Sequence, residues 1–454
     1  MIDWTKYRGI TSDSREVYDG FVFFCVPNDL GVATTYINQA LAKGASCIVV
    51  DEKSQVEGHT RVKDIHKVIA DAASEFYPMQ PSNVMAVTGT NGKTSTVGFV
   101  FQILSLLGKK AATIGTLGVV KESDVIGLDN TTPGAIDMHR YMEGFVIEGI
   151  DYAAFEASSH ALCQHRVDGL RIKAAAFTNL TQDHLDYHKD MKSYFEAKKI
   201  LFFELLDESG TAVLNADDES YDELLKCGRK VLSYGKNGND LKIISVDGSK
   251  LCLEILGKKY EIEFPVFGYF QVMNVLCAVG MLIGCGIAVD DIMQCLPKLK
   301  APDGRLEFIG EFKGAKIFVD YAHTPDALEK AINALKPYAK NKTAVLFGCG
   351  GDRDATKRPK MGRIASDLAD RVYVTDDNPR TEDAAVIRRE IMAACPKGID
   401  AGDRGLAIAK AMNDLENGDV LLVAGKGHEN YQIVGKTKHH FSDKEEILAL
   451  MQSF

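Results

Sequence analysis

The segment AVTGTNGKTST, residues 86–96, has the residue types of a phosphate-binding loop. It follows an apolar run at 83–89 and opens a helical pattern, so backbone N–H groups and the positive helix end could cradle phosphates. Lys93 would reach the terminal phosphates, and Thr94 could bind Mg²⁺. The common pattern G-x-x-x-x-G-K-[ST] would require glycine where this chain has Val87. The loop alone therefore indicates a nucleotide site or, as the alternative, a glycine-rich turn with an exposed lysine.

Two further residues could act on an anionic reaction centre. Glu156 ends the apolar run DYAAFE, and His184 follows the run AAAFTNL. A carboxylate oxygen and an imidazole nitrogen can both bind Mg²⁺, although oxygen is preferred. Taken singly, Glu156 could instead cap a helix, and His184 or His188 could be a hydrogen-bonded loop histidine.

Two arginines could bind anionic groups of a substrate. Arg380 ends the stretch DDNPR, and Arg166 lies in ASSHALCQHR. A guanidinium can pair with a carboxylate through two charge-assisted hydrogen bonds. The alternatives are a surface ion pair for Arg166 and an exposed loop arginine, paired with Glu382 or Asp383, for Arg380.

The elements that must position these residues read as alternating strands and helices. In the middle of the chain the pattern predicts strands at 83–89, 151–158, 174–180 and 211–216, with helices at 93–107 and 191–206. Such alternation predicts a parallel sheet covered on both faces. Towards the C-terminus it predicts strands at 316–322, 343–350, 371–377 and 419–425, with helices at 325–335 and 383–394. Ligands of such folds bind beyond the carboxyl ends of the strands, where DDNPR lies.

The N-terminal segment is a smaller unit with strands predicted at 21–26 and 45–51 and a helix at 36–44. Prolines at 78 and 81 and the stretch LPKLKAPDG at 296–304 mark boundaries. We therefore predict an α/β protein of three domains: a small mixed α/β domain at 1–80, a central doubly wound parallel-sheet ATPase domain at 81–302, and a C-terminal Rossmann-like domain at 303–454.

Composition narrows the classes of partner and compartment. A formal net charge of -10 argues against binding to nucleic acid or an anionic membrane, which needs massed Lys and Arg. The N-terminus lacks a basic-then-apolar leader, and no apolar run approaches a membrane span. Ten scattered cysteines without a C-x-x-C pair fit reduced thiols. We expect a cytoplasmic protein.

Further motifs along the chain resemble those of the Mur ligase superfamily, ATP-dependent enzymes that form amide bonds on peptidoglycan precursors and, in a related branch, on folates. The resemblance covers nearly the whole chain and rests on GTNGKTS (89–95), DSR (13–15), NTTP (130–133), EASSHAL (156–162), TNLTQDHLDYH (178–188), YFEAKK (194–199), DYAHTPD (320–326), GCGGDRD (348–354), DDNPR (376–380) and AGKGHE (424–429).

The resemblance implies ATP and Mg²⁺ and a set of catalytic residues, Lys93, Glu156, His184 and Lys198. It also implies that Lys198 is carbamylated by CO₂ and holds Mg²⁺ with Thr94, Glu156 and His184. Lys199 is the alternative in register, since an amphipathic helix normally exposes its lysines. The implied ATP contacts are Gly89, Thr90, Asn91, Gly92, Lys93, Thr94, Ser95, Asn274, Arg305, Asp320 and His323. Gln271 stands where the family commonly has asparagine.

The resemblance also implies substrate contacts. Those to the UDP-linked muramoyl-dipeptide are Ser14, Asn130, Thr131, Thr132, Ser158, Gln164 and Arg166. Those to the added amino acid are Arg353, Asp377, Asn378, Pro379, Arg380, Gly425 and Glu429. The stretch PNDLGVATTYI at 27–37 departs from the family, which usually shows a glycine and then D-G, so uracil docking there is open.

The D-N-P-R motif resembles the diaminopimelate-adding branch. Meso-diaminopimelate differs from L-lysine by a distal carboxylate that Arg380 could bind, whereas lysine would leave the arginine facing an ammonium group. We expect ATP to phosphorylate the D-glutamyl carboxylate of UDP-N-acetylmuramoyl-L-alanyl-D-glutamate, and the amine to attack the acyl phosphate. Closure of the C-terminal domain, in a monomer, would exclude water. The alternatives are an L-lysine-adding form, a folylpolyglutamate synthetase-like ligase, and a nucleotide-binding regulator or scaffold without turnover.

Overall fold

The computed structural model describes residues 2–122 and 124–453, which form two compact units. The first unit runs through Ser245 and also contains Cys252–Glu261 and Val275–Leu296. The second contains Val246–Leu251, Ile262–Asn274 and the chain from Pro297 onwards. The boundary expected near residue 80 lies inside the first unit, so the three-domain division stays a prediction, while the α/β class is confirmed.

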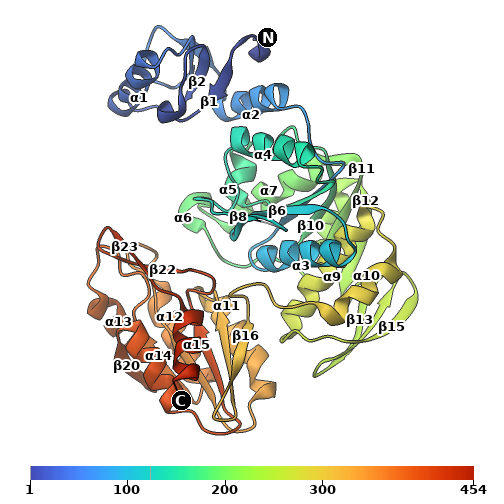
Figure 1. Ribbon diagram of the computed structural model, residues 1–454, viewed down its shortest axis with the longest axis vertical. Coiled ribbons are helices and arrows are strands. Elements are labelled where there is room, and N and C mark those ends of the chain that lie inside the picture. The colour runs from blue at the N-terminus through green and yellow to red at the C-terminus, as the bar shows by residue number, and fades with distance from the viewer. Residues whose placement is uncertain (1, 123, 454) are drawn as a thin grey trace. The chain divides into compact units, whose positions relative to one another are not determined.

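A four-stranded parallel sheet opens the first unit, with strands in the order β1-β2-β3-β4. One face packs on α2, which also contacts α4 (Figure 1). The other face packs on α1. The elements are β1 (Gly9–Thr11), β2 (Phe21–Cys25), α1 (Leu30–Ala42), β3 (Cys47–Asp51), β4 (Thr60–Val62) and α2 (Ile65–Phe76). The strands predicted at 21–26 and 45–51 are confirmed.

Helix α1 begins six residues before the start predicted from the sequence, at Leu30 instead of residue 36. The reason is an N-cap, because the Asp29 carboxylate accepts a hydrogen bond from the Val32 amide at 3.0 Å. The helix thus absorbs most of the stretch 27–37 that departs from the family pattern.

Removing this cap should measurably destabilise the four-stranded region. We expect Asp29→Ala to lower the free energy of unfolding by about 1 kcal/mol, because the Val32 amide loses its acceptor. Urea unfolding followed by circular dichroism would measure the change. Asp29→Asn is the matched control, since an asparagine caps equally well. An equal loss in both variants would contradict the capping role.

The central sheet of the first unit has eleven strands in the order β15-β14-β13-β12-β11-β10-β5-β9-β6-β7-β8. Its inner strands are parallel, as predicted, whereas β7 and β8 extend it in antiparallel fashion. The strands are β5 (Asn83–Thr88), β6 (Ala111–Gly115), β7 (Gly118–Lys121), β8 (Asp124–Ile126), β9 (Tyr152–Glu156), β10 (Ile172–Phe177), β11 (Leu206–Asn215), β12 (Lys230–Gly235), β13 (Leu241–Asp247), β14 (Lys250–Ile255) and β15 (Lys258–Glu263).

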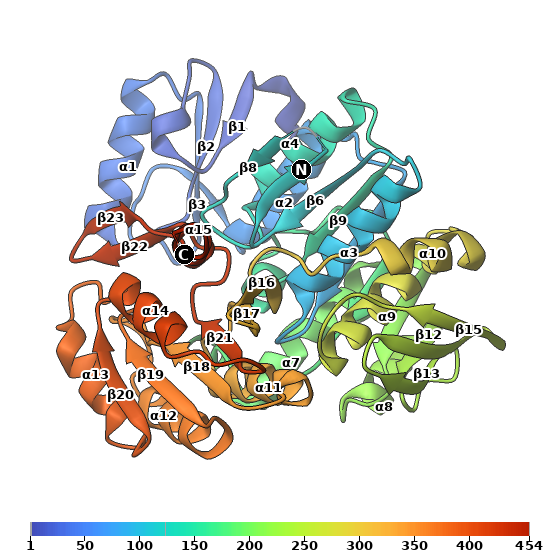
Figure 2. The same cartoon turned by 60° about the horizontal axis from the view of Figure 1, so that its bottom comes forward.

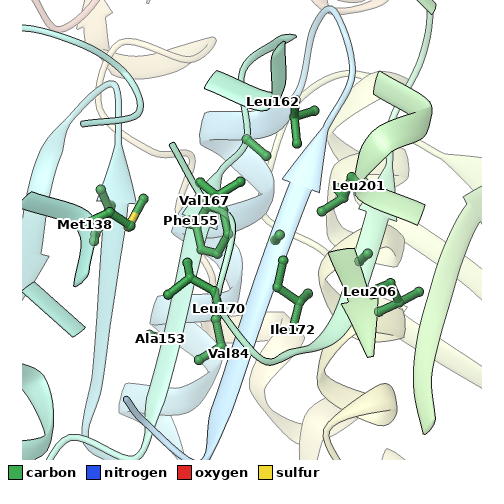
Figure 3. Close-up of a cluster of buried hydrophobic side chains, with 14 of the residues drawn as sticks. Val84, Met138, Ala153, Phe155, Leu162, Val167, Leu170, Ile172, Leu201 and Leu206 are labelled. Atoms are coloured by element: carbon green, nitrogen blue, oxygen red, sulfur yellow. The ribbon is translucent and has the colours of Figure 1, made fainter. Parts of the chain in front are cut away.

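Both faces of this sheet are covered, because successive residues of a strand point to opposite sides. Ala212 and Leu214 of β11 belong to one buried cluster, shown in Figure 3 with side chains from β5, β9 and β10. Val213, between them, lies against Gly280 of α9 on the other face. The helices of this region are α3 (Lys93–Leu106), α4 (Ala135–Ile147), α5 (Ser159–Cys163), α6 (Leu185–His188), α7 (Met191–Ile200), α8 (Tyr221–Leu224), α9 (Tyr269–Gly284) and α10 (Val289–Cys295).

The second unit is built on a six-stranded sheet in the order β16-β17-β21-β18-β19-β20, parallel except for the edge strand β16. Helices α11, α12 and α13 share one buried cluster, while α14 and α15 share the other (Figure 2). The elements are β16 (Glu307–Phe312), β17 (Ala315–Asp320), α11 (Pro325–Leu335), β18 (Thr343–Phe347), α12 (Lys357–Leu368), β19 (Arg371–Thr375), α13 (Ala384–Met392), β20 (Gly398–Gly402), α14 (Arg404–Asn413), β21 (Val420–Ala424), β22 (Tyr431–Val434), β23 (Thr437–His440) and α15 (Asp443–Gln452).

A fully buried ion pair fixes the carboxyl ends of two of these strands. Arg404 and Asp443 form two hydrogen bonds of 2.7 Å each. The same guanidinium also donates to the carbonyls of Ala424, at 2.9 Å, and Asp376, at 3.4 Å. Because the buried guanidinium is paired with a carboxylate and two carbonyls, it holds the first residues of the loops after β19 and β21 in place.

None of the helices in residues 2–122 and 124–453 combines the length and the apolar character that a membrane-spanning helix needs.

Candidate active site

The phosphate loop predicted from the sequence joins β5 to α3 in the first unit. Gly92 caps α3 with a φ of 91°. Gly89 has a φ of 141°, and a Cβ there would lie 1.9 Å from the Thr178 hydroxyl. Both positions therefore require glycine. Lys93 folds back over the loop, and its Nζ donates to the carbonyls of Gly89 and Thr90 at 2.9 Å each.

A second loop, which follows β10, holds the phosphate loop in place. The Thr90 amide donates to the carbonyl of Asn179 at 2.8 Å, and the Asn91 amide donates to the Asn179 side chain at 3.0 Å. The Thr90 hydroxyl donates to the carbonyl of Thr181 at 3.1 Å. Sequence reasoning did not single out Asn179 or Thr181. Their signal was the polar run TNLT directly after a buried strand.

Glu156 lies at the carboxyl end of β9, and its side chain is buried. Its Oε2 accepts from the Thr94 hydroxyl at 3.1 Å, and its Oε1 accepts from the Thr116 amide at 2.8 Å. Gly115 permits this approach, since a Cβ there would lie 2.3 Å from Oε1. Thr116 was not predicted. The helix-capping alternative for Glu156 is wrong, because its oxygens bond to Thr94 and Thr116.

The two neighbouring lysines of α7, Lys198 and Lys199, lie in different environments. Lys198 is 1% exposed, and its Nζ lies 4.2 Å from the centre of the Tyr194 ring. Burial lowers the pKa of Lys198 well below its usual range, and the charge of Lys93 lowers it further. Lys199 instead pairs with Glu196 at 3.3 Å and Glu223 at 3.1 Å. The inward lysine is therefore Lys198.

Tyr194 connects Lys198 with the phosphate loop. Its hydroxyl lies 3.3 Å from the Thr90 hydroxyl, and burial raises its pKa. The tyrosine thus stays neutral and packs its ring face against the lysine amine. Because one side chain contacts both groups, the loop and the buried lysine form one local site.

The histidines of this region differ in environment. His184 has a left-handed φ of 53°, a side chain 47% exposed, and an Nε2 3.5 Å from Asp183. His188 is buried, with its Nε2 2.9 Å from the Ser159 hydroxyl. His160 lies between them, with ring centres 5.1 Å from His184 and 5.4 Å from His188. His188 therefore matches the hydrogen-bonded alternative, whereas the His184 side chain lies next to Asp183 and is about half exposed.

The donors present fit Mg²⁺. The Thr94 hydroxyl and the Glu156 carboxylate are hard oxygen donors 3.1 Å apart. Within residues 2–122 and 124–453, no group of three or more His, Cys, Asp or Glu side chains is arranged to hold a metal ion. Mg²⁺ usually takes one or two protein ligands and completes its shell with water and substrate phosphates, so one hydroxyl and one carboxylate are sufficient protein ligands.

The residues expected to contact the dipeptide surround the end of β9. The Thr132 hydroxyl donates to the carbonyl of Glu156 at 2.7 Å. Arg166 donates to the carbonyl of Thr132 at 2.8 Å and to the Gln164 side chain at 2.6 Å. Burial lowers the pKa of Arg166. Arg166 bonds to neutral acceptors, so the surface ion pair considered for it is wrong.

The four remaining dipeptide candidates lie in different settings. Ser158 caps α5, accepting from the Ala161 amide at 3.2 Å. Thr131 lies 3.2 Å from the Thr116 hydroxyl, next to exposed Asn130. Ser14 belongs to the four-stranded region, where it donates to Gln39 at 2.8 Å. Thr131 and Ser158 thus lie near Glu156, Asn130 precedes Thr131 on the surface, and Ser14 is held by α1.

The second unit holds the residues expected on the adenine and ribose side. Asn274 donates to Gln271 at 3.0 Å, and Gln271 donates to the carbonyl of Arg305 at 2.8 Å. Gln271 therefore keeps the amide function of the usual asparagine. The Arg305 guanidinium stacks 4.4 Å from the centre of the Tyr321 ring. The carbonyl of Tyr321 in turn lies 2.8 Å from His323 Nδ1.

Asp320 ends β17 beside this group. Its carboxylate accepts from the amides of Leu306 at 2.6 Å and Ala322 at 2.8 Å. Burial raises the pKa of Asp320 to about 6, although Arg305 and the amides act against that rise. The carboxylate is therefore mostly ionised at neutral pH. Through these two amides it holds the main chain in place next to Arg305 and next to His323.

His428 near Arg305 should make stability depend on pH. Burial, with a contribution from Arg305, lowers the pKa of His428 to about 4. The neutral ring is thus favoured in the fold, and its contribution is present above pH 6.5 and lost as pH falls towards 4. Between pH 7 and 4.5 the wild type should lose about 2 kcal/mol of unfolding free energy relative to His428→Gln. Urea unfolding at both pH values tests this; equal losses would contradict it.

The amino-acid candidates meet beyond the carboxyl ends of β18, β19 and β21 in the second unit. Asn378 donates through Nδ2 to Glu429 at 3.0 Å, while its Oδ1 accepts from Lys426 at 3.2 Å and from the Ile433 amide at 2.9 Å. Lys426 is fully buried and pairs with Glu429 at 3.1 Å. Sequence reasoning missed Lys426, although it lies inside the motif AGKGHE. This lysine fixes both the amide of Asn378 and the carboxylate of Glu429.

Arg380 lies in the same loop cluster with a left-handed φ of 52°. Its Nη1 donates to the carbonyl of Gly351 at 2.8 Å. In the described part of the chain no carboxylate lies within ion-pairing distance of its guanidinium. Glu382 pairs with Arg358, and Asp383 caps α13. The surface ion pair considered for Arg380 is therefore wrong.

The other candidates in this cluster have supporting or exposed positions. Asp377 is buried, and its Oδ2 would lie 2.9 Å from a Cβ at Gly425, which has a φ of 114°. Pro379 is buried in the turn before Arg380. Arg353 is exposed and donates to the carbonyl of Asp352 at 3.0 Å. The structure thus brings Asp377, Asn378, Arg380, Gly425 and Glu429 together and leaves Arg353 at the rim.

Comparisons with known proteins identify the family of the chain. The family model for the Mur ligase middle domain matches residues 87–282, and that for the Mur ligase glutamate ligase domain matches 304–427. The chain is 44% identical, over an alignment of 462 positions that covers 99% of this chain and 95% of the relative, to UDP-N-acetylmuramoyl-L-alanyl-D-glutamate--2,6-diaminopimelate ligase of Bradyrhizobium diazoefficiens. It is also 44% identical to the same-named protein of Rhizobium meliloti, over 97% of this chain and 93% of that one. A solved structure with that name, 31% identical, gives a TM-score of 0.71 and covers 98% of this chain and 95% of its own.

Proposed function

The chain belongs to the Mur ligase family, and on that premise we propose that it is an ATP-dependent ligase that joins meso-2,6-diaminopimelate to UDP-N-acetylmuramoyl-L-alanyl-D-glutamate. Relatives at 44% identity over nearly the whole chain carry that name. The observation that carries the choice of amino acid is Arg380, a guanidinium held by backbone carbonyls with no carboxylate partner among the described residues.

The first step builds an acyl phosphate. A carboxylate oxygen of the D-glutamyl side chain attacks the terminal phosphorus of ATP, an O–P bond forms, and the bond to ADP breaks. Lys93 and the amides at the start of α3 supply positive charge where the phosphate oxygens gather. Arg166 offers a desolvated guanidinium for an anionic part of the dipeptide.

Mg²⁺ would be held by Thr94 and Glu156, with His184 and Lys198 as further candidates, and when bound it would neutralise charge on the phosphate oxygens. The hydrogen bond from the Thr116 amide holds the Glu156 carboxylate in position. We infer that Lys198 becomes a carbamate, because a buried lysine of lowered pKa offers the neutral amine that CO₂ requires. Lys199, paired with Glu196 and Glu223, lacks this property.

The second step forms the amide. The amine of diaminopimelate attacks the acyl carbon, a tetrahedral intermediate forms, and phosphate leaves as the nitrogen gives up a proton. Arg380 would pair with the distal carboxylate, and Glu429 and Asn378 would take the adjacent ammonium group. L-lysine lacks that carboxylate, so it would leave the guanidinium unpaired.

An amino-acid screen tests this function. The protein, ATP, Mg²⁺ and the UDP-linked dipeptide are incubated with meso-diaminopimelate or L-lysine, and ADP release and product mass are measured. Diaminopimelate should be strongly preferred. Equal rates with lysine would contradict the assignment of the amino acid. ADP release that depends on a folate instead would favour a folylpolyglutamate synthetase, and an absence of turnover would favour a nucleotide-binding regulator.

We further infer that the protein works as a cytoplasmic monomer, where ATP and its nucleotide-linked substrate are available. All ten cysteines are free thiols in the structure, which fits a reducing compartment. Light scattering after size-exclusion chromatography would test the oligomeric state, and a mass of twice the chain would contradict it.

A further inference from the structure

A buried arginine behind the amino-acid loops has no role in the reaction described so far. Arg358, on α12, is 2% exposed. Its Nη2 donates to both oxygens of Glu382 at 2.9 Å, and its Nη1 donates to Glu390 at 2.8 Å. A third contact joins Nη2 to the carbonyl of Gly350 at 3.4 Å. One guanidinium therefore connects the loop after β18 with the loop after β19.

Glu382 is a carboxylate of the same loop as Arg380, and its Cβ lies 3.2 Å from a Cβ built at Gly351, the residue whose carbonyl the Arg380 guanidinium contacts. It follows Arg380 by two residues, inside the turn closed by a hydrogen bond from its own amide to the carbonyl of Pro379 at 3.1 Å. Yet both of its oxygens are occupied by Arg358, and Oε1 also accepts from the Asp352 amide at 2.5 Å. The Arg358 hydrogen bonds lower the pKa of Glu382, so it stays anionic.

The other nearby carboxylates are occupied as well. Asp352 accepts from the hydroxyl of Thr381 at 2.8 and 2.9 Å and from its amide at 3.2 Å. Asp383 accepts from the Ala385 amide at 2.8 Å and caps α13. Neither is held by an arginine. Glu382 is thus the acid whose release depends on one side chain.

We propose that Arg358 is a positioning residue that determines amino-acid specificity by holding Glu382, and so keeps the Arg380 guanidinium available for the distal carboxylate of the substrate. This rests on the proposed role of Arg380. Without Arg358, Glu382 would pair with Arg380 and act as an internal competitor for diaminopimelate. A charge-assisted pair in that place would oppose binding of the substrate carboxylate, and would not oppose lysine.

The double substitution separates this role from simple structural support. Arg358→Met should raise KM for diaminopimelate about 10-fold to 100-fold with little change in kcat, and lower the preference over lysine equally. Glu382→Gln should keep the preference, because an amide carries no charge. The double variant Arg358→Met with Glu382→Gln should regain most of the preference for diaminopimelate. It still lacks the ion pair, but residue 382 no longer carries a charge that could pair with Arg380. Glu390→Gln, which removes the other partner of the same guanidinium, is the matched control and should behave as wild type.

Two results would overturn the inference: an unchanged preference in Arg358→Met, or a double variant as unselective as Arg358→Met. A wild type that takes lysine equally well would contradict the proposed function itself, and a selective wild type with an insensitive Arg358→Met contradicts only this inference. If thermal unfolding shows that Arg358→Met does not fold, Arg358→Gln in the same two backgrounds makes the comparison, because a neutral amide leaves the negative charge of Glu382 uncompensated.

Discussion

Replacing Lys198 with alanine should reduce ligase turnover by about 10³-fold, the scale expected when one preorganised electrostatic group is lost from an active site. The amine is buried, its pKa is lowered by burial and by Lys93, and its contact is the Tyr194 ring. A neutral amine can attack CO₂: the nitrogen lone pair forms the N–C bond, a C=O pair moves to oxygen, and a proton leaves to solvent. The product would be an anion next to the Tyr194 ring, in place of a potential cation.

A spectroscopic measurement separates carbamylation from packing. Protein kept in ¹³C-labelled bicarbonate should show a carbamate carbon signal by NMR that is absent in Lys198→Ala. Activity in CO₂-free buffer should fall and return when bicarbonate is added. Lys199→Ala is the matched control. Its pairs with Glu196 and Glu223 lie near the surface and away from the buried amine, so signal and turnover should persist. A signal retained in Lys198→Ala would refute the assignment.

That control also shows what the sequence could decide about the site. Lys198 and Lys199 are neighbours in FEAKK, and helical periodicity alone leaves their register open. Burial depends on which face of α7 packs inwards, and that is a property of the tertiary structure. The family motif and the fold select the same lysine. In contrast, Glu156 and the phosphate loop were predictable locally, because each lies at the end of a buried apolar strand.

Some elements of the fold could likewise be predicted from the sequence, and others could not. Buried parallel strands such as β5 and β21 are apolar along their length, so their runs in the sequence are clear. The edge strand β15 and its neighbour β14 are only partly buried, because β15 alternates exposed with half-buried residues after its first position and β14 alternates buried with half-buried residues after its first position; neither strand was predicted. The start of α1 was missed because it depends on one cap, Asp29. Long-range pairs such as Arg358 with Glu382 leave no local pattern, since 24 residues separate them.

Replacing Arg380 with alanine should reverse the choice of amino acid. We expect kcat/KM for meso-diaminopimelate to fall by about 10²-fold to 10³-fold, the cost of leaving one member of a desolvated charge pair alone. The rate with L-lysine should be unchanged or higher, because an ammonium group no longer faces a guanidinium. The loop itself should persist, since its main chain is held by Ile433 and Gly435 independently of the side chain. Competition of the two amino acids, followed by product mass, measures the ratio directly.

Arg363→Ala provides the matched control, because it removes an exposed arginine from α12 in the same unit. Its preference for diaminopimelate should equal that of wild type, so a general loss of positive charge cannot explain a shift in Arg380→Ala. Arg380→Lys adds a second comparison: it keeps the charge but has no planar fork, and should recover only part of the preference. If Arg380→Ala still selected diaminopimelate as wild type does, the distal carboxylate would have to be recognised elsewhere, and the buried ammonium of Lys426 beside Asn378 would be the next group to test.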